Sequence, residues 1–102
     1  MYGLDEKVIQ DLKETFSKFP AVEKVILYGS RAMGTYRKGS DIDITLLGKN
    51  LSIQTVFGIQ DEIEDLYLPY SFDISIYDRI DNEDLIDHIK SVGKVLYEKK
   101  GS

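Results

Sequence analysis

The sequence has no cysteine, no tryptophan and a single histidine, His88, in 102 residues. Without cysteine the chain can form no disulfide and no Cys-ligated zinc site, and one histidine is too few for a structural zinc cluster. A Ser-His-Asp triad would depend on His88 alone, which lies among polar residues and far in sequence from the motifs described below. Thiol chemistry and structural zinc are therefore excluded, and we expect no catalytic role for His88.

Long hydrophobic runs are also absent, since no apolar stretch approaches the roughly 20 residues that a membrane-spanning helix needs. Basic residues are in the minority, with 13 Lys and Arg against 18 Asp and Glu, which gives a net charge of −5. A net-acidic chain is poorly suited to the many phosphate contacts of non-specific nucleic-acid binding. We therefore expect a cytoplasmic protein that neither enters a membrane nor binds DNA directly.

The charges that are present lie unevenly along the chain. The segment 24–40 holds four basic residues and no acid, whereas the segment 61–87 holds ten acids and one base. Such runs are either solvated faces or, for the basic segment, a local anion site on an otherwise acidic protein. The motifs within these segments decide between the two interpretations.

Hydrophobic periodicity predicts a single α/β (α+β) domain over residues 1–102. Apolar residues at helical spacing alternate along the chain with runs in which apolar and polar residues alternate strictly. The predicted topology is a small mixed sheet of about three to four strands covered by helices. The predicted helices are 4–19, 52–66 with Ser52 as N-cap, and 82–97; the predicted strands are 22–28, 41–47 and 72–77; and a short helix follows Gly29.

Aspartate, which is depleted in strands, stands in both later strands. Asp41 and Asp43 are two residues apart, so they project from one face with Cα atoms about 7 Å apart. Asp73 repeats the pattern on the next strand, and pairing of the two strands would bring all three together. Carboxylates that close repel one another unless a cation lies between them, and Mg²⁺ suits such oxygen ligands. The alternative is three ordinary Asp residues on an exposed sheet face.

The loop before these carboxylates has the properties of an anion site. A strand that ends at Gly29-Ser30 and leads into a short helix leaves backbone N–H groups free. Gly29 allows close approach of a phosphate, the Ser30 hydroxyl can cap the helix or donate to a phosphate oxygen, and Arg31 is suited to bidentate phosphate binding. Carboxylates for a metal and donors for phosphates together predict a nucleoside-triphosphate site.

Gly29-Ser30, ten intervening residues and then Asp41-Ile42-Asp43 resemble the signature of the polymerase-β-like nucleotidyltransferase superfamily. The stretch GSRAMGTYRKGSDIDI resembles the minimal nucleotidyltransferase (MNT) subfamily, prokaryotic antitoxin partners of HEPN-domain proteins. Nearly the whole chain shares the resemblance, including SFDISIYD, which holds Asp73, and the ending VGKVLYE. Many relatives carry a basic residue where this chain has Met33, and an acidic residue or proline where it has Gly39. These departures change the charge of the loop and leave the three Asp residues unaffected.

The resemblance implies the polymerase-β-like fold and a Mg²⁺-dependent nucleotidyltransferase. It implies that Gly29 and Ser30 bind the phosphates of ATP or another nucleoside triphosphate, and that Asp41 and Asp43 bind two Mg²⁺ ions. Asp73 would be the third carboxylate, a metal ligand and a base for the acceptor hydroxyl. The implied reaction moves AMP onto a hydroxyl of a HEPN toxin, so that the chain acts as an antitoxin.

A second interpretation is a non-catalytic antitoxin that occludes its partner and keeps the nucleotide site as a sensor or relic. In either case the sheet, its helices and the phosphate loop take up the 102 residues, so we expect the acceptor on another molecule or subunit. Tyr36 and the segment 67–70 are candidate contact residues, because exposed aromatic residues favour interfaces, or they roof the core. Self-association and hetero-oligomer formation both stay open.

Overall fold

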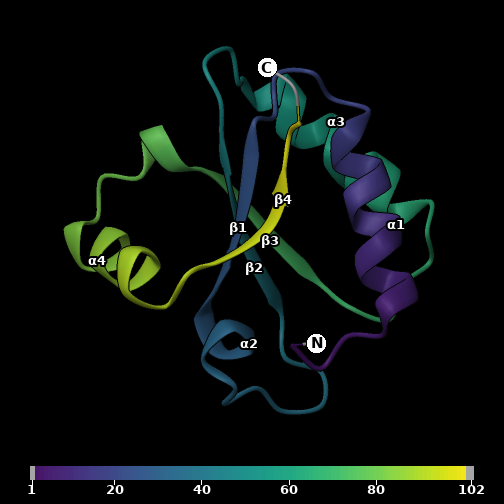
Figure 1. Cartoon of the computed structure of the whole chain (residues 1–102), viewed down its shortest axis with the longest axis vertical. Coiled ribbons are helices and arrows are strands. Elements are labelled where there is room, and N and C mark those ends of the chain that lie inside the picture. The colour runs from purple at the N-terminus through teal and green to yellow at the C-terminus, as the bar shows by residue number, and fades with distance from the viewer. Residues whose placement is uncertain (1, 101–102) are drawn as a thin grey trace.

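A computed structural model describes residues 2–100 as a four-stranded sheet with helices packed around it (Figure 1). This confirms the predicted fold class, a small mixed sheet covered by helices. No helix within residues 2–100 has the length and apolar character needed to cross a membrane. In chain order the elements are α1 Glu6–Ser17, β1 Lys24–Tyr28, α2 Gly29–Met33, β2 Ile42–Leu47, α3 Ile53–Glu64, β3 Phe72–Ile76, the 3-10 turn η1 Tyr77–Arg79, α4 Glu83–Val92 and β4 Lys94–Glu98.

The strand order β3-β2-β1-β4 places β1 and β2 at the centre of the sheet. β1 runs antiparallel to both β2 and β4, whereas β2 and β3 are parallel and are joined by the crossover helix α3. A parallel pair needs a crossover of this kind because its strands begin at the same end. The C-terminal end of β1 therefore meets the N-terminal ends of β2 and β3 at one end of the sheet.

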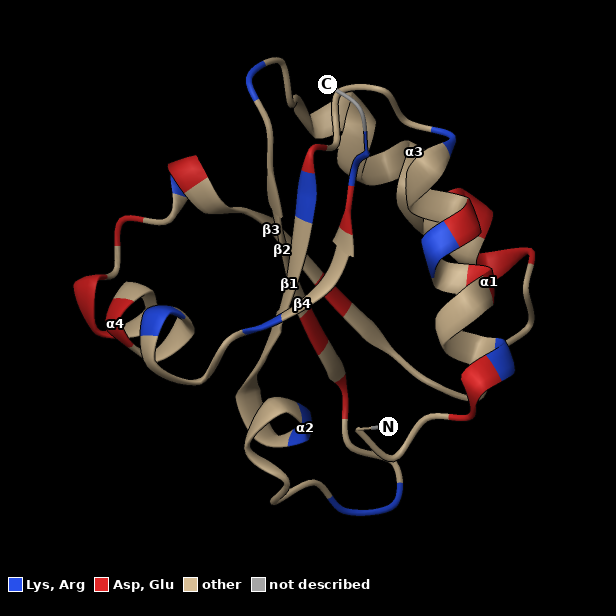
Figure 2. Ribbon diagram, in the orientation of Figure 1, with Lys and Arg blue, Asp and Glu red and all other residues tan. Residues whose placement is uncertain are grey.

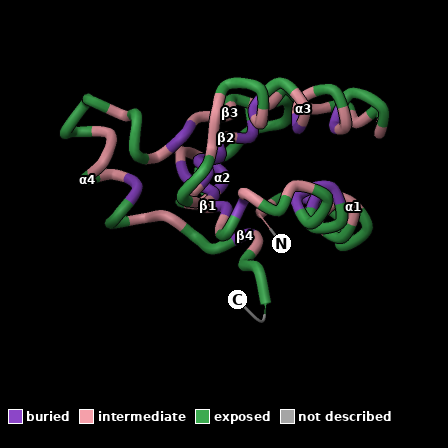
Figure 3. Tube along the Cα trace, turned by 90° about the horizontal axis from the view of Figure 1, so that it is seen from above, coloured by how far each residue is buried: buried purple, intermediate pink, exposed green. Residues whose placement is uncertain are grey.

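The two faces of the sheet carry different helices. Figures 1 and 3 show α1 and α3 side by side on one face and α4 on the other, with α2 at the end of the sheet. Alternate residues of β2, namely Ile42, Ile44 and Leu46, are fully buried in the core with Leu12 and Phe16 of α1. Because side chains alternate along a strand, the residues between them face the side of α4. On β2 the face opposite the main core thus carries the polar side chains of Asp43 and Thr45.

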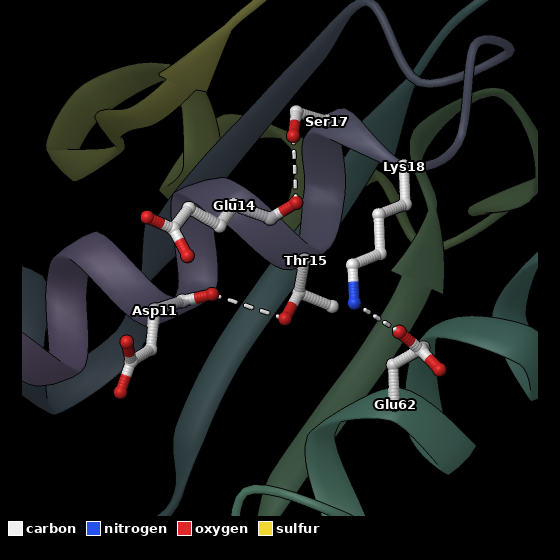
Figure 4. A network of polar contacts seen from close by, with 6 residues as sticks. All are labelled: Asp11, Glu14, Thr15, Ser17, Lys18 and Glu62. Carbon is white, nitrogen blue, oxygen red and sulfur yellow. Dashed lines mark hydrogen bonds and ion pairs between the residues drawn. The ribbon is translucent and has the colours of Figure 1, made fainter.

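The helices on the core face are also joined at the surface. Lys18, directly after α1, donates from Nζ to Glu62 Oε1 of α3 at 2.7 Å (Figure 4). The hydrogen bond and the negative charge of Glu62 raise the pKa of Lys18. Within α1 the buried Thr15 donates from Oγ1 to the carbonyl oxygen of Asp11 at 3.0 Å. Because both charged groups of the ion pair contact solvent, the pair orients the two helices more than it stabilises them.

The start of α3 is the one predicted from the sequence. Ser52 is the N-cap, and its Oγ accepts a hydrogen bond from the backbone N–H of Thr55 at 3.4 Å. The Oγ1 of Thr55 in turn accepts from the backbone N–H of Ser52 at 3.3 Å. This reciprocal capping box satisfies two N–H groups that the first turn of a helix leaves without partners.

The predicted helix over residues 82–97 is wrong in its second half. α4 begins after Asn82, whose side chain accepts from the backbone N–H of Leu85, and it ends at Val92. Residues Lys94–Glu98 form a fourth strand that pairs with β1. Leu96, which the helical pattern placed on the inner face of a helix, is buried from this strand instead.

Gly93 is the physical reason for the break. Its backbone has ψ near 142°, which is extended and ends the helix. A Cβ at this position would overlap the carbonyl oxygen of Ile89 and lie 2.7 Å from Cγ2 of Ile26 on β1. The sequence therefore needs glycine where α4 turns into β4 against the sheet.

We expect Gly93→Ala to lower the free energy of unfolding by about 2 kcal/mol, because the methyl group has no room beside Ile26 and Ile89. Chemical denaturation compares the variant with Ser91→Ala, an exposed position on α4. In a continuous helix the same change would raise stability, since alanine has the higher helix propensity. A more stable variant would therefore contradict the observed end of α4.

Candidate functional site

The strand register brings two of the predicted carboxylates side by side. Asp43 of β2 is directly paired with Asp73 of β3 in the parallel ladder, and on its other side Asp43 is paired with Tyr28, the last residue of β1. Figure 2 shows acidic segments on β2 and on the neighbouring β3. Asp41 is exposed and precedes β2 by one residue. The structure thus places Asp43 and Asp73 at one point of the sheet and Asp41 at its margin.

The surroundings of Asp43 favour its uncharged form. Burial raises the pKa of the Asp43 carboxyl, and the negative charges of Asp73 and Asp41 raise this pKa further, while His88 acts in the opposite direction. The pKa of Tyr28 is raised as well, first by burial and then by the charges of Asp73 and Asp43, and a hydrogen bond with Ser75 offsets part of this shift. A cation beside Asp43 would remove the repulsive part of both shifts, which adds to the larger effect of burial.

The donor atoms at this point are carboxylate oxygens, which suit a hard divalent cation such as Mg²⁺. Within residues 2–100, no three His, Asp or Glu side chains are gathered closely enough to hold a metal ion. The chemistry of Asp41, Asp43 and Asp73 therefore fits a metal, although their side chains are not closed around a single point.

The turn after β1 lies directly against Asp43. Gly29 has φ +74°, in the left-handed region that favours glycine. A Cβ at Gly29 would overlap Oδ2 of the Asp43 side chain, so only glycine allows the main chain to pass here. Ser30 follows as the second residue of α2, where it is half-buried, and Tyr28 is the N-cap in place of Ser30. The predicted phosphate-binding pair Gly29-Ser30 and the predicted metal ligand Asp43 are thus adjacent.

Arg31, which the sequence suggested as a bidentate phosphate ligand, is buried and binds main-chain carbonyl groups. Only 3% of its surface is exposed. Its Nε and Nη2 both donate to the carbonyl oxygen of Ser40, at 3.2 and 3.0 Å, and Nη1 donates to the carbonyl oxygen of Tyr2 at 3.1 Å. The rings of Tyr36 and Tyr70 lie over the guanidinium at 5.2 and 5.0 Å. Arg31 therefore clamps the loop that leads into Asp41.

His88, for which we expected no catalytic role, contacts the turn that carries Gly29. Nε2 of His88 on α4 accepts a hydrogen bond from the backbone N–H of Gly29 at 3.0 Å. The imidazole also packs edge-on against the ring of Tyr28, with 6.1 Å between centroids and 80° between planes. The contact joins residues 59 positions apart, and the sequence holds no signal for it beyond the fact that His88 is the single histidine.

The candidate contact tyrosines have different settings. Tyr70 packs against the core and on Arg31, Tyr36 packs on Arg31 from an exposed position, and Tyr67 is 89% exposed with φ +53°. Tyr67 also lines a cavity of about 520 Å³ between α3 and the edge strand β3, with Leu68, Tyr70 and Phe72 among its walls. Asp73 belongs to the same strand as this cavity but projects from the opposite face.

Comparison with known proteins identifies the family. Residues 10–102 match the family described as Polymerase beta, Nucleotidyltransferase. The chain belongs to the polymerase-β nucleotidyltransferase family. This confirms the superfamily predicted from Gly29-Ser30 and Asp41-Ile42-Asp43. A search of curated protein sequences finds no match.

Solved structures share the nucleotidyltransferase fold over almost the whole chain. One is a toxin–antitoxin complex with AMP-PNP, with 22% identity and a TM-score of 0.70 over 95% of this chain and 76% of that chain. Another holds a tri-AMPylated HEPN toxin of Shewanella oneidensis with its MNT antitoxin, with 22% identity and a TM-score of 0.62 over 98% of this chain and 75% of that chain. A third, the toxin–antitoxin complex MntA-HepT, has 21% identity and a TM-score of 0.57 over 92% and 69%. These neighbours show that the chain shares their fold.

Replacing the crowded carboxylate should stabilise the nucleotidyltransferase without metal. In EDTA at pH 7 we expect Asp43→Asn to have a higher Tm than the unchanged protein, because the pKa of Asp43 is raised in the folded state. A raised carboxyl pKa means that the ionised group costs stability above that pKa, and the cost disappears as pH falls below the ordinary value of 3.8. The Tm difference should therefore shrink toward pH 3.

The exposed Asp78 provides the matched control for this pH series. Asp78→Asn removes the same charge from the chain at a position outside the carboxylate pair, so its Tm difference should be small at every pH. Equal Tm changes in the two variants would show that net charge, and not the crowding at Asp43, is responsible.

The clamp formed by Arg31 predicts a second effect on stability. Arg31→Lys should lower the free energy of unfolding by about 2 kcal/mol, because lysine cannot hold the carbonyl groups of Ser40 and Tyr2 together. Thermal and urea denaturation would measure the change against Arg37→Lys, which alters an exposed residue of the same loop. Equal stability of the two variants would contradict the clamp.

Proposed function

We propose that this nucleotidyltransferase moves AMP from ATP onto a hydroxyl group of a HEPN-domain partner and thereby acts as an antitoxin. The observation that carries the proposal is the contact between two parts of the site, the Gly29-Ser30 turn and the Asp43 carboxylate beside Asp73. Structural neighbours support the choice of nucleotide and partner, because one was solved with AMP-PNP and another contains a tri-AMPylated HEPN toxin with its MNT antitoxin.

Asp41, Asp43 and Asp73 are the residues that would hold Mg²⁺, and the family resemblance implies two ions. The raised pKa of Asp43 supports this assignment, since a bound cation would favour the ionised carboxylates that now repel one another. When bound, Mg²⁺ would neutralise the negative charge that the phosphates bring to the carboxylates.

The chain's own residues would orient the two reactants. The Gly29-Ser30 turn would lie along the triphosphate, with the Ser30 hydroxyl as a donor to a phosphate oxygen. The acceptor oxygen attacks the α-phosphorus, the bond from this phosphorus to the bridging oxygen breaks, and pyrophosphate leaves. Asp73 is exposed, so its carboxylate would be open to the partner and could accept the proton of the attacking hydroxyl.

A partner would supply the acceptor. The sheet, its helices and the connecting loops account for the described residues. Asp41 and Asp73 are exposed, so a second molecule can reach their carboxylates. Asp73 lies on the edge strand β3, where another protein can approach without displacing a strand.

Labelled ATP provides the direct test. The protein is incubated with Mg²⁺, a HEPN-domain protein and ATP labelled at either the α or the γ phosphate. We expect label on the HEPN protein from α-labelled ATP only, and a loss of at least about 100-fold with Asp43→Asn or Asp41→Asn, because each substitution removes a proposed metal ligand.

Asp78→Asn, which keeps the proposed site intact, is the matched control and should transfer AMP at the rate of the unchanged protein. Label from γ-labelled ATP would indicate a kinase and overturn the proposal. Inhibition of the toxin with no label from either position, and equal inhibition by Asp43→Asn, would instead favour the antitoxin that acts by occlusion.

A further inference from the structure

His88 makes a contact at the site that has no part in the proposed reaction steps. Its Nε2 accepts the backbone N–H of Gly29 at 3.0 Å, although α4 and the turn after β1 lie 59 residues apart. The contact is possible because α4 packs against both β1 and α2. The imidazole is half-buried and lies edge-on to Tyr28, the residue directly before Gly29.

The bond fixes the orientation of the ring. Nε2 points at the Gly29 main chain and accepts its N–H, so the contact is between a side-chain acceptor of α4 and a main-chain donor of the turn. Tyr28 limits rotation of the ring from one side, and the main chain of Tyr28 is paired with Asp43 of β2. His88 thus contacts both Gly29 and the residue that is paired with Asp43.

Gly29 is a position where the main chain needs support. It is the first residue of α2, so its N–H has no acceptor within the helix. Its φ of +74° directs the chain over the Asp43 carboxylate, where there is no space for a side chain that could hold the turn. The acceptor for this N–H therefore comes from α4.

We propose that His88 is a positioning residue, which holds the Gly29 main chain against Asp43 and thereby fixes the distance between the phosphate-binding turn and the carboxylates. Because Nε2 occupies the Gly29 N–H, the turn binds phosphate through Ser30 and not through this amide. The effect on phosphate binding rests on the proposed function, whereas the hydrogen bond and its effect on the turn do not.

Hydrogen exchange of the Gly29 amide, measured by NMR on the whole chain, tests the bond without any activity assay. In His88→Ala we expect exchange at Gly29 to become at least about tenfold faster, because a partly buried donor loses its acceptor. His88→Gln places a carbonyl oxygen at similar reach and should return the rate to within about threefold of the original.

Two controls distinguish a local effect on Gly29 exchange from unfolding of the protein. Ser91→Ala, an exposed change on α4, should leave Gly29 exchange unaltered. Amides of the buried strand residues Ile44 and Leu46 report whether His88→Ala remains folded. Unchanged exchange at Gly29 in a folded His88→Ala variant would overturn the proposal.

The effect on the nucleotide is measured by calorimetric titration with Mg²⁺ and AMP-PNP. We expect the Kd to rise about tenfold in His88→Ala and to recover in His88→Gln, as for a lost hydrogen bond. A change in Tm without a change in Kd would show that His88 stabilises α4 and does not position the turn for the nucleotide. Absence of AMP-PNP binding by the unchanged protein would overturn the proposed function but not the exchange result.

Discussion

The site depends on one close approach, that of the Gly29 main chain to the Asp43 carboxylate. Pairing between β1 and β2 places Tyr28 opposite Asp43, so the residue after Tyr28 must turn directly beside that carboxylate. Glycine alone fits, because it combines φ +74° with the absence of a Cβ. Phosphate-binding and carboxylate groups become neighbours through strand pairing, and their adjacency does not depend on a flexible loop.

The side chains that stabilise the fold and the carboxylates of the site lie on opposite faces of the same strands. Ile42, Ile44 and Leu46 bury one face of β2 in the core, while Asp43 between them faces the side of α4. The burial and repulsion that raise the pKa of Asp43 are costs to folding. The apolar face offsets them, so a crowded carboxylate can be kept in a chain of only 102 residues.

Much of this arrangement follows from local patterns, and the rest depends on contacts between distant segments. Strict alternation predicted β2 and β3, and the Ser52 cap predicted the start of α3, because these signals act within a few residues. The pattern over residues 82–97 suits a helix until Gly93 meets Ile26, a contact with β1 that no local pattern reveals. His88 was missed because its partner Gly29 is 59 residues away, and the clamp of Arg31 depends equally on tertiary structure.

The position of β4 has a consequence for how the molecule forms. β1 lies between β2, which follows it closely in sequence, and β4, whose pairing joins Lys24 to Glu98. Contacts of such wide sequence separation carry a large loop-closure entropy and slow folding. During synthesis on a ribosome the sheet cannot close until residues 94–98 have emerged, so β1 keeps one edge unpaired until then.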